Sequence, residues 1–221
     1  MSRDRKITLT KEMIVDQAME LADTIGSDAL TMRKLAHAIG TAPMTIYYYL
    51  SSKDLLIDEM VERVFSEIAI PPMDQEWKPA LRTRCQSARQ VLNRHFWAAP
   101  LMESRSTPGP ANMRHHDAVI GCLRRGGFPI ALAAHAYAVL DSYVYGFAFE
   151  ETTIPEVNQD GFAPAVETIA SQIDAKEYPH LFEMAREHVL KPGYEFGSSF
   201  DFGLDLILNG LERALLDGAY R

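Results

Sequence analysis

Cysteine is scarce in this chain, and long apolar runs are missing. The two cysteines among 221 residues, Cys85 and Cys122, lie on separate helical patterns and form no CxxC pair. We therefore expect no disulfide framework, and reduced thiols in a cytoplasmic protein. The least charged stretch, residues 126–149, contains Asp141, whereas a membrane span needs about 20 predominantly apolar residues. The first residues hold no apolar segment, so we expect neither a secretory signal nor a membrane partner.

Signatures of catalysis are missing as well. The sequence has no recognisable Ser–His–Asp arrangement, phosphate-binding loop or catalytic carboxylate pair. His115, His116 and Asp117 are consecutive, but adjacent residues of a helix point in different directions, so one histidine at most would face a site. We expect no enzyme, no metal site and no cofactor.

Positive charge is low overall but is not spread evenly. The formal net charge is -8. Residues 1–53 hold seven Lys and Arg against six Asp and Glu, so this part carries +1 and the remaining 168 residues carry -9. A near-neutral N-terminal part allows local contact with phosphate groups, while the acidic remainder repels nucleic acid.

Apolar residues recur at helical spacing along most of the chain, and no alternating strand pattern is evident. Thr10 is typical of a helix start and Gly40 of a helix end. The pattern predicts helices over residues 10–25, 31–39, 43–49, 52–69, 77–96, 99–104, 111–125, 129–151, 177–190 and 197–218. Residues 152–177 are less regular, with one weak helix.

The predicted fold is all-α, with an N-terminal three-helix head and a larger helical body. Pro71 and Pro72 end the fourth helix, because consecutive prolines cannot continue it. We therefore expect a helix-turn-helix DNA-binding head over residues 1–53, a connecting helix over 54–70, and a ligand-binding and dimerisation body over 71–221.

The stretch from Thr31 to Leu56 has the pattern of a helix-turn-helix. Two short helices meet at Gly40, since glycine tolerates the positive φ that a sharp turn needs. The second helix would present apolar and hydroxyl-bearing side chains outward: Thr41, Ala42, Pro43, Met44, Thr45, Tyr47 and Tyr48. Such side chains suit base edges, thymine methyl groups and phosphate oxygens in a major groove.

Here the chain resembles the TetR family of transcriptional regulators. The resemblance covers residues 8–60 and rests on the LAxxxGxxxxTxYYY core and the Ser-Lys-Asp-Leu-Leu segment that follows it. It implies that Thr45, Tyr47 and Lys53 hold phosphates. It also implies that a second group faces the bases, Thr41, Ala42, Pro43, Met44 and Tyr48, with Thr31 and Arg33 in support.

The recognition helix departs from common base readers, because it has no Arg, Asn or Gln for two-pronged hydrogen bonding. Methyl contacts and DNA shape would then determine more of the base preference. Arg3, Arg5 and Lys6 could form an arm that reaches neighbouring phosphates. Tyr49 is expected to pack inward, since three consecutive tyrosines cannot all face DNA. The alternative is a helical hairpin that serves packing alone.

The resemblance continues in the body, where residues 143–151 and 200–215 are similar to segments of the tetracycline-repressor subgroup. In that subgroup these helices form a four-helix bundle between subunits. Independently, the last predicted helix has a broader apolar stripe than one contact face requires. The expected dimer-interface residues are Gly146, Phe200, Leu204, Ile207, Leu208, Leu211 and Leu215. A core within one chain is the alternative.

The helix expected at 129–151 is apolar nearly all round, so both of its sides must be covered. One side would meet the partner subunit and the other would line a cavity. The candidate ligand-binding residues are aromatic, methionine or polar: His95, Phe96, Trp97, Met102, Met113, His116, Tyr137, Asp141, Tyr145 and Phe149. They suit a largely apolar small molecule, although an ordinary core would look similar.

Asp141 is the unusual member of that set. An unpaired buried charge is costly, so this carboxylate should be paired or protonated. We expect an ion pair with an arginine such as Arg89 or Arg94.

These patterns together predict a repressor that binds palindromic operator DNA as a homodimer and is released by a small, largely apolar effector. Two alternatives stay open at this point. One is a helical ligand-binding protein without DNA function, and the other is a regulator whose ligand promotes DNA binding.

Overall fold

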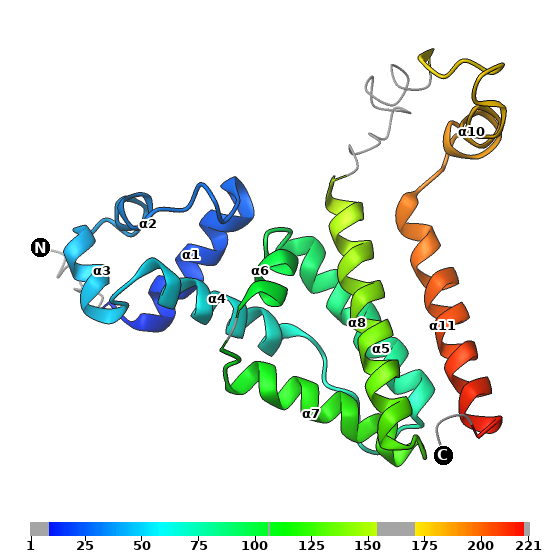
Figure 1. Cartoon of the computed structure of the whole chain (residues 1–221). Helices are drawn as coiled ribbons and strands as arrows, with labels where there is room; N and C mark the ends of the chain where they lie inside the picture. The colour runs from blue at the N-terminus through cyan, green and yellow to red at the C-terminus, as the bar shows by residue number, and fades with distance from the viewer. Residues whose placement is uncertain (1–8, 106, 154–170, 219–221) are drawn as a thin grey trace, which may run out of the picture.

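The computed structural model describes residues 9–105, 107–153 and 171–218, and every regular element in these ranges is a helix (Figure 1). The all-α prediction is therefore confirmed. The predicted arm residues Arg3, Arg5 and Lys6 lie outside the described residues. In chain order the elements are α1 (Lys11–Ile25), α2 (Met32–Ile39), α3 (Pro43–Tyr49), α4 (Lys53–Glu67), α5 (Trp77–Arg94), α6 (Ala98–Ser104), α7 (Pro110–Arg125), α8 (Ile130–Thr153), α10 (Pro179–Met184), η1 (Ala185–Val189), η2 (Phe196–Ser198) and α11 (Ser199–Leu216).

The helices α1, α2 and α3 lie together at one end of an elongated molecule, and α4 runs from them into the body (Figure 1). In the body α5 and α8 pack closely, α7 packs against α4, and α11 lies beside α8. No helix in the described ranges combines the length and the apolarity that a bilayer crossing requires.

The predicted helix starts in the head are made by side-chain caps. The hydroxyl of Thr10 accepts the backbone N–H of Met13 at 3.3 Å, and Thr31 accepts that of Lys34 at 3.2 Å. These bonds satisfy N–H groups that have no partner inside the first turn of a helix. α2 ends at Gly40, whose φ of 76° is in the left-handed region that favours glycine.

Near the C-terminus the structure differs from the predicted helices in detail. The single helix expected at 177–190 is a short α10 followed by a π-helical turn, η1. The last helix is preceded by the 3₁₀ turn η2. The helix expected to end at Phe96 stops at Arg94, because His95 leaves helical geometry with φ -111° and ψ 60°.

Part of the expected dimer interface is instead the core of the chain itself. Phe200, Leu204 and Leu208 are fully buried, and Leu211 is nearly so. The physical reason is that α11 is apolar on more than one side, and its most regular stripe packs against α5 and α8. Ile207 and Leu215 are partly buried against the same core, while Gly146 is exposed.

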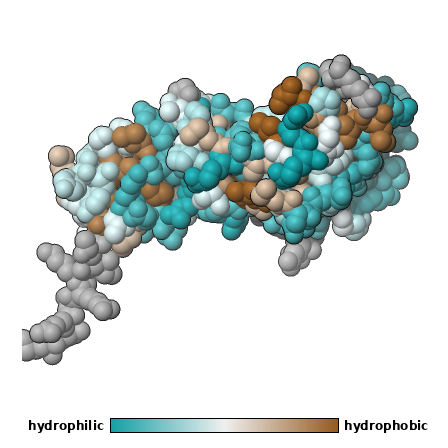
Figure 2. Space-filling view, turned by 90° about the horizontal axis from the view of Figure 1, so that it is seen from below, coloured by the Kyte–Doolittle hydropathy of each residue, from teal (hydrophilic) through white to brown (hydrophobic). Residues whose placement is uncertain are grey.

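Other apolar residues occupy the outward side of these two helices. Phe202 and Leu206 on α11 are 69% and 60% exposed, and Val139 and Phe149 on α8 are about half exposed. Apolar residues form separate patches on an otherwise largely hydrophilic surface (Figure 2). Single exposed apolar residues are normal on a protein surface, whereas several of them on two adjacent helices indicate an interaction site.

Replacing Gly40 by alanine should destabilise the chain, because a residue with a Cβ loses about 1–2 kcal/mol in the left-handed region. Gly121→Ala is the matched control, since Gly121 lies inside α7 and an added Cβ there meets only the flexible end of Arg125. That change should leave stability unchanged or raise it by up to about 1 kcal/mol. Urea unfolding at one protein concentration measures both variants. Equal effects would contradict the role assigned to Gly40.

Candidate functional site

The outward surface of α3 is apolar and aromatic, yet it is exposed. Met44 is 76% exposed and Tyr48 86%. Ile46, on the opposite side of the same helix, is fully buried and fixes α3 on the head. All residues that the sequence assigned to this surface lie on it: Ala42, Pro43, Met44, Thr45, Tyr47 and Tyr48 are exposed, and Thr41 is half-buried. Tyr49 is partly buried against the core, as predicted.

The supporting residues predicted around α3 have partners within the head. Thr31 caps α2 through its oxygen, so its hydroxyl proton remains for another acceptor. The ammonium of Lys53 donates to the carbonyl of Ser27 at 3.3 Å, which places a positive charge at the start of α4. An ammonium has three donors, so this bond leaves others for a phosphate oxygen. Arg33 is exposed on α2.

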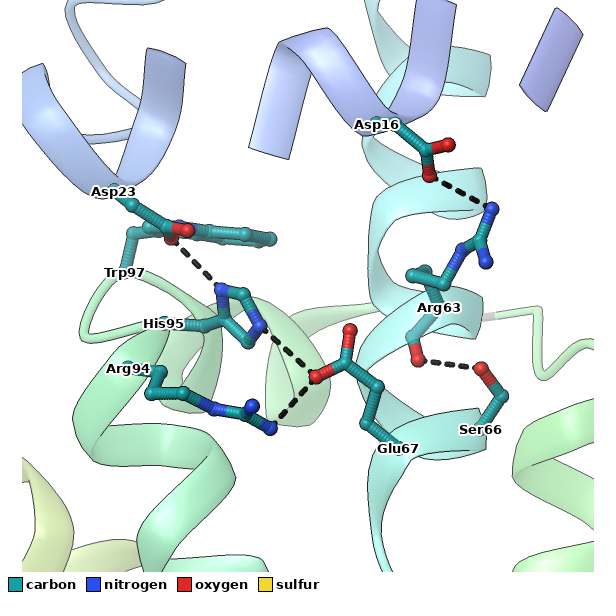
Figure 3. A network of polar contacts seen from close by, with 8 residues as sticks. All are labelled: Asp16, Asp23, Arg63, Ser66, Glu67, Arg94, His95 and Trp97. Carbon is teal, nitrogen blue, oxygen red and sulfur yellow. Dashed lines mark hydrogen bonds and ion pairs between the residues drawn. The ribbon is translucent and has the colours of Figure 1, made fainter. Parts of the chain in front are cut away.

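A polar network joins the head to the body where α1, α4 and the corner after α5 meet (Figure 3). Asp23 of α1 accepts the indole N–H of Trp97 at 2.6 Å and lies 2.8 Å from Nδ1 of His95. The other ring nitrogen of His95 lies 3.3 Å from Glu67 of α4, which also binds Arg94 at 2.8 Å. His95 thus stands between carboxylates of two different helices.

This network corrects two of the predicted ligand-binding residues. His95 and Trp97 are buried, but they line the junction between head and body rather than a ligand cavity. The reason is that their ring N–H groups need acceptors, and α1 and α4 supply carboxylates there. Local spacing could not show this, because Asp23 is more than 70 residues away in the sequence.

The body also contacts the first half of α4. Nε of Arg105, the residue after α6, donates to the carboxylate of Asp58 at 2.6 Å, and Nη2 donates to the carbonyl of Asp54 at 3.2 Å. Glu62 accepts the backbone N–H groups of Ala111 and Asn112 in the first turn of α7. A carboxylate is favourable at this end of a helix. Consequently α4 is tied to both α6 and α7.

A cavity of about 520 Å³ lies between α6 and α8. Its lining residues are Glu103, Tyr137, Ala138, Asp141, Ser142, Tyr145 and Gly146. The structure therefore brings together three of the predicted ligand-binding residues, Tyr137, Asp141 and Tyr145. His116 is next to them, since the hydroxyl of Tyr137 contacts its Nδ1.

The other predicted lining residues lie elsewhere. Met102 is buried in the core, whereas Phe96, Met113 and Phe149 are exposed at other points of the surface. Sequence reasoning missed Glu103, Ala138 and Ser142, and it assigned Gly146, which also lines the cavity, to the dimer interface. The two residues on α8 could have been found from helical spacing, because Ala138 and Ser142 share a side of the helix with Asp141 and Tyr145.

Asp141 is paired, as expected, but with a different arginine. Its Oδ1 lies 2.7 Å from Nη1 of Arg84, and both side chains are almost fully buried. Arg89 instead binds Glu151, and Arg94 binds Glu67. The choice follows from the geometry of α5, whose buried side faces α8 and includes Arg84. Burial is the largest influence and lowers the pKa of Arg84, but Asp141, together with Tyr145 and Cys85, raises it by more, so the pKa of Arg84 is raised overall.

His115 of α7 completes this buried cluster. Nε of Arg84 donates to Nε2 of His115 at 3.0 Å. A guanidinium can only donate, so Nε2 is the acceptor and the ring proton is on Nδ1. Burial, and then the charges of Arg84 and His116, lower the pKa of His115 to about 3. Among the described residues Nδ1 has no hydrogen-bond partner.

The phenols above the cluster stay protonated. Burial, followed by the charge of Asp141, raises the pKa of Tyr137 and that of Tyr145 above the ordinary value of 10. The hydroxyl of Tyr145 points to Oδ2 of Asp141 at 3.5 Å. The cavity therefore has a neutral aromatic wall over a buried ion pair.

Known proteins match both parts of the chain. Residues 14–60 match the family described as bacterial regulatory proteins, tetR family. Residues 70–215 match the one described as tetracyclin repressor-like, C-terminal domain. The transcriptional repressor DrrR1 of Streptomyces coeruleorubidus, which is of the helix-turn-helix type, is 30% identical over 96% of this chain and 80% of its own length.

Solved structures from Streptomyces coelicolor share the arrangement of helices. A possible TetR family transcriptional regulator has a TM-score of 0.77 and 28% identity, and the match covers 93% of this chain and 100% of that one. ActR in complex with actinorhodin has a TM-score of 0.72 and 27% identity, over 97% of this chain and 100% of that one.

The buried His115 predicts a defined dependence of stability on pH. Its pKa is about 3 when folded and 6.5 as the ordinary value, so the unfolded chain binds this proton first as the pH falls. The stability contribution is complete above about pH 6.5 and is lost toward pH 3, with a slope of up to about 1.4 kcal/mol per pH unit. His115→Gln keeps an acceptor for Arg84 without this titration.

Urea unfolding between pH 7 and 4 should therefore show the wild type losing its advantage over His115→Gln as the pH is lowered. A difference in unfolding free energy that stays constant over this range would mean that His115 does not titrate as described.

Proposed function

The chain belongs to the TetR family of bacterial transcriptional regulators, and we propose that it is a cytoplasmic repressor that binds a palindromic operator as a homodimer and is released by a small molecule. The observation that supports this most directly is the exposed apolar surface of α3. Leaving such side chains in water is unfavourable unless a partner covers them. In this proposal residues 1–53 bind DNA, 54–70 connect, and 71–221 bind ligand and dimerise.

Two kinds of DNA contact are proposed. Thr45, Tyr47 and Lys53 hold phosphates, and phosphate binding at Lys53 is supported by the start of α4, because a helix N-terminus favours anions. Bases are read by the protruding side chains of the recognition helix, supported by α2: Thr41, Ala42, Pro43, Met44, Tyr48, Thr31 and Arg33. Phosphate contacts position the protein, whereas base contacts determine sequence preference.

The proposed dimer interface is the outward side of α8 and α11. It contains Val139 and Phe149 on α8 and Phe202 and Leu206 on α11. Gly146, which also lines the cavity, remains part of the proposal, because it is exposed on α8 and a glycine allows a second helix to approach closely. A dimer of this kind would place two recognition helices on half-sites about 34–36 Å apart.

Release by a ligand is proposed to act through α6. The cavity residue Glu103 lies on α6, two residues before Arg105, which binds Asp58 and the backbone of Asp54 on α4. A ligand that displaces α6 would move Arg105 and hence α4, which leads directly to the head. A coupling free energy of about 1–3 kcal/mol is sufficient to change DNA affinity substantially. ActR, a structural relative, is described in complex with the small molecule actinorhodin.

Variants of the recognition surface test the DNA proposal. Gel-shift titrations with the DNA upstream of the protein's own gene should show salt-sensitive, sequence-specific binding. Lys53→Ala should weaken binding to all sequences alike and lower the salt slope by about 2, because each dimer loses two phosphate contacts. Met44→Ala should change the ranking of sequences, by about 1–3 kcal/mol at the affected base pair. Lys176→Ala, at an exposed lysine of the body, is the control and should change neither.

If Lys53→Ala and Met44→Ala behave alike, the division between phosphate and base contacts is wrong. If the wild type binds no palindrome in a sequence-specific way, the repressor proposal itself is wrong, and a ligand-binding protein without DNA function is the better description.

The dimer interface can be tested separately. Phe202→Asp combined with Leu206→Asp should yield monomers in sedimentation experiments, because four carboxylates would meet in an apolar interface. Met73→Asp changes an exposed apolar residue in the loop before α5 and should leave the dimer intact. A double variant that sediments as a dimer would place the interface elsewhere.

A further inference from the structure

We propose that the cavity between α6 and α8 binds an organic cation, with an amine or quaternary ammonium group on an aromatic or aliphatic body. This inference rests on the proposed function for the role of the cavity, and it adds the chemical class of the effector. The volume of about 520 Å³ is within the range of small-molecule sites, about 300–1,000 Å³.

The first supporting observation is the charge of the cavity wall. Its residues include two carboxylates, Glu103 and Asp141, and no lysine or arginine. Asp141 is neutralised by the buried Arg84. Glu103 has no hydrogen-bond or ion-pair partner among the residues that the structure describes, whereas Asp58 and Glu62 on α4 are engaged by Arg105 and by the start of α7. Glu103 is exposed, so one carboxylate of the wall is solvated and is free to meet a cationic ligand.

The second observation is that aromatic rings stand beside this carboxylate. Tyr137 and Tyr145 both line the cavity, and burial and the charge of Asp141 raise their pKa values, so the phenols remain neutral. The charge of Glu103 raises both pKa values too, which is consistent with a position near these rings. A cation over an aromatic face near a carboxylate gains from both interactions.

The third observation is that the cavity offers no free positive group to an anionic ligand. Arg84 is 1% exposed, and its guanidinium is already bound by Asp141 on one side and His115 on the other. His115 is neutral, and burial lowers the pKa of His116 as well. Hence no positive group of the described lining is available to an anion, while a cation has a carboxylate, two rings and the hydroxyl of Ser142.

Two triarylmethane dyes of opposite charge distinguish these cases. Crystal violet is a permanent cation and phenol red an anion, and both can be titrated calorimetrically into the full-length protein without DNA. Crystal violet should bind at least about tenfold more tightly than phenol red. Glu103→Gln, which removes the charge but keeps the shape, should weaken crystal violet by about tenfold. Asp74→Asn removes a charge in the exposed loop before α5 and should have no effect.

The proposal is overturned if phenol red binds as tightly as crystal violet, if neither dye binds, or if Glu103→Gln behaves like Asp74→Asn. Thermal unfolding of each variant shows whether it is folded, and the comparison of the two dyes on the wild type needs no variant. Gel shifts on the same preparations separate the two proposals. Operator binding without dye selectivity contradicts only the ligand class, and dye selectivity without operator binding contradicts only the repressor.

Discussion

The buried contact between Arg84 and Asp141 is the constraint on which the rest of the body depends. It joins α5 to α8, and the second side of the guanidinium joins α5 to His115 on α7. Removing one partner of such a pair leaves a charge in the interior, which typically costs about 3–5 kcal/mol. Three helices of the body, α5, α7 and α8, are therefore positioned by one polar cluster, and Tyr145 extends that cluster to the cavity wall on α8.

The connection between body and head is also polar, but it is built differently. His95, Trp97 and Arg94 contact acids of α1 and α4 at a junction that is partly open to water. Interactions of partly exposed charges are weaker and easier to rearrange than those of buried ones. The helices of the body are thus joined by a buried ion pair, whereas the head is joined to the body by partly exposed polar contacts, which rearrange more easily.

Much of this architecture could be predicted from the sequence, because its signals are local. Thr10, Thr31 and Gly40 define helix ends within three or four residues of themselves, and the structure shows these ends. Asp141 could be predicted to have a partner, since burial of a lone carboxylate is unfavourable. That the partner is Arg84 depends on which side of α5 faces α8, and no local pattern contains this information.

The predictions that were wrong also depend on which side of a helix faces which neighbour. His95 and Trp97 looked like cavity residues because aromatic side chains at helical spacing also occur at junctions. Phe200 and Leu204 were assigned to a dimer interface, although they form the core and Phe202 and Leu206 point outward. A helix that is apolar on two sides does not reveal which side meets its own chain and which meets solvent or a partner.

The body holds α4 at three points, whereas the start of this helix lies in the head. Glu67 binds Arg94 at the C-terminal end of α4, Glu62 binds the start of α7, and Asp58, nine residues before Glu67, binds Arg105. With a rise of about 1.5 Å per residue, Asp58 lies about 13 Å and Lys53 about 21 Å from Glu67. A sideways shift of about 1 Å at Asp58 would thus become about 1.5 Å at the start of the helix. In the proposed homodimer both α4 helices would move, so the separation of their N-terminal ends would change by up to twice as much.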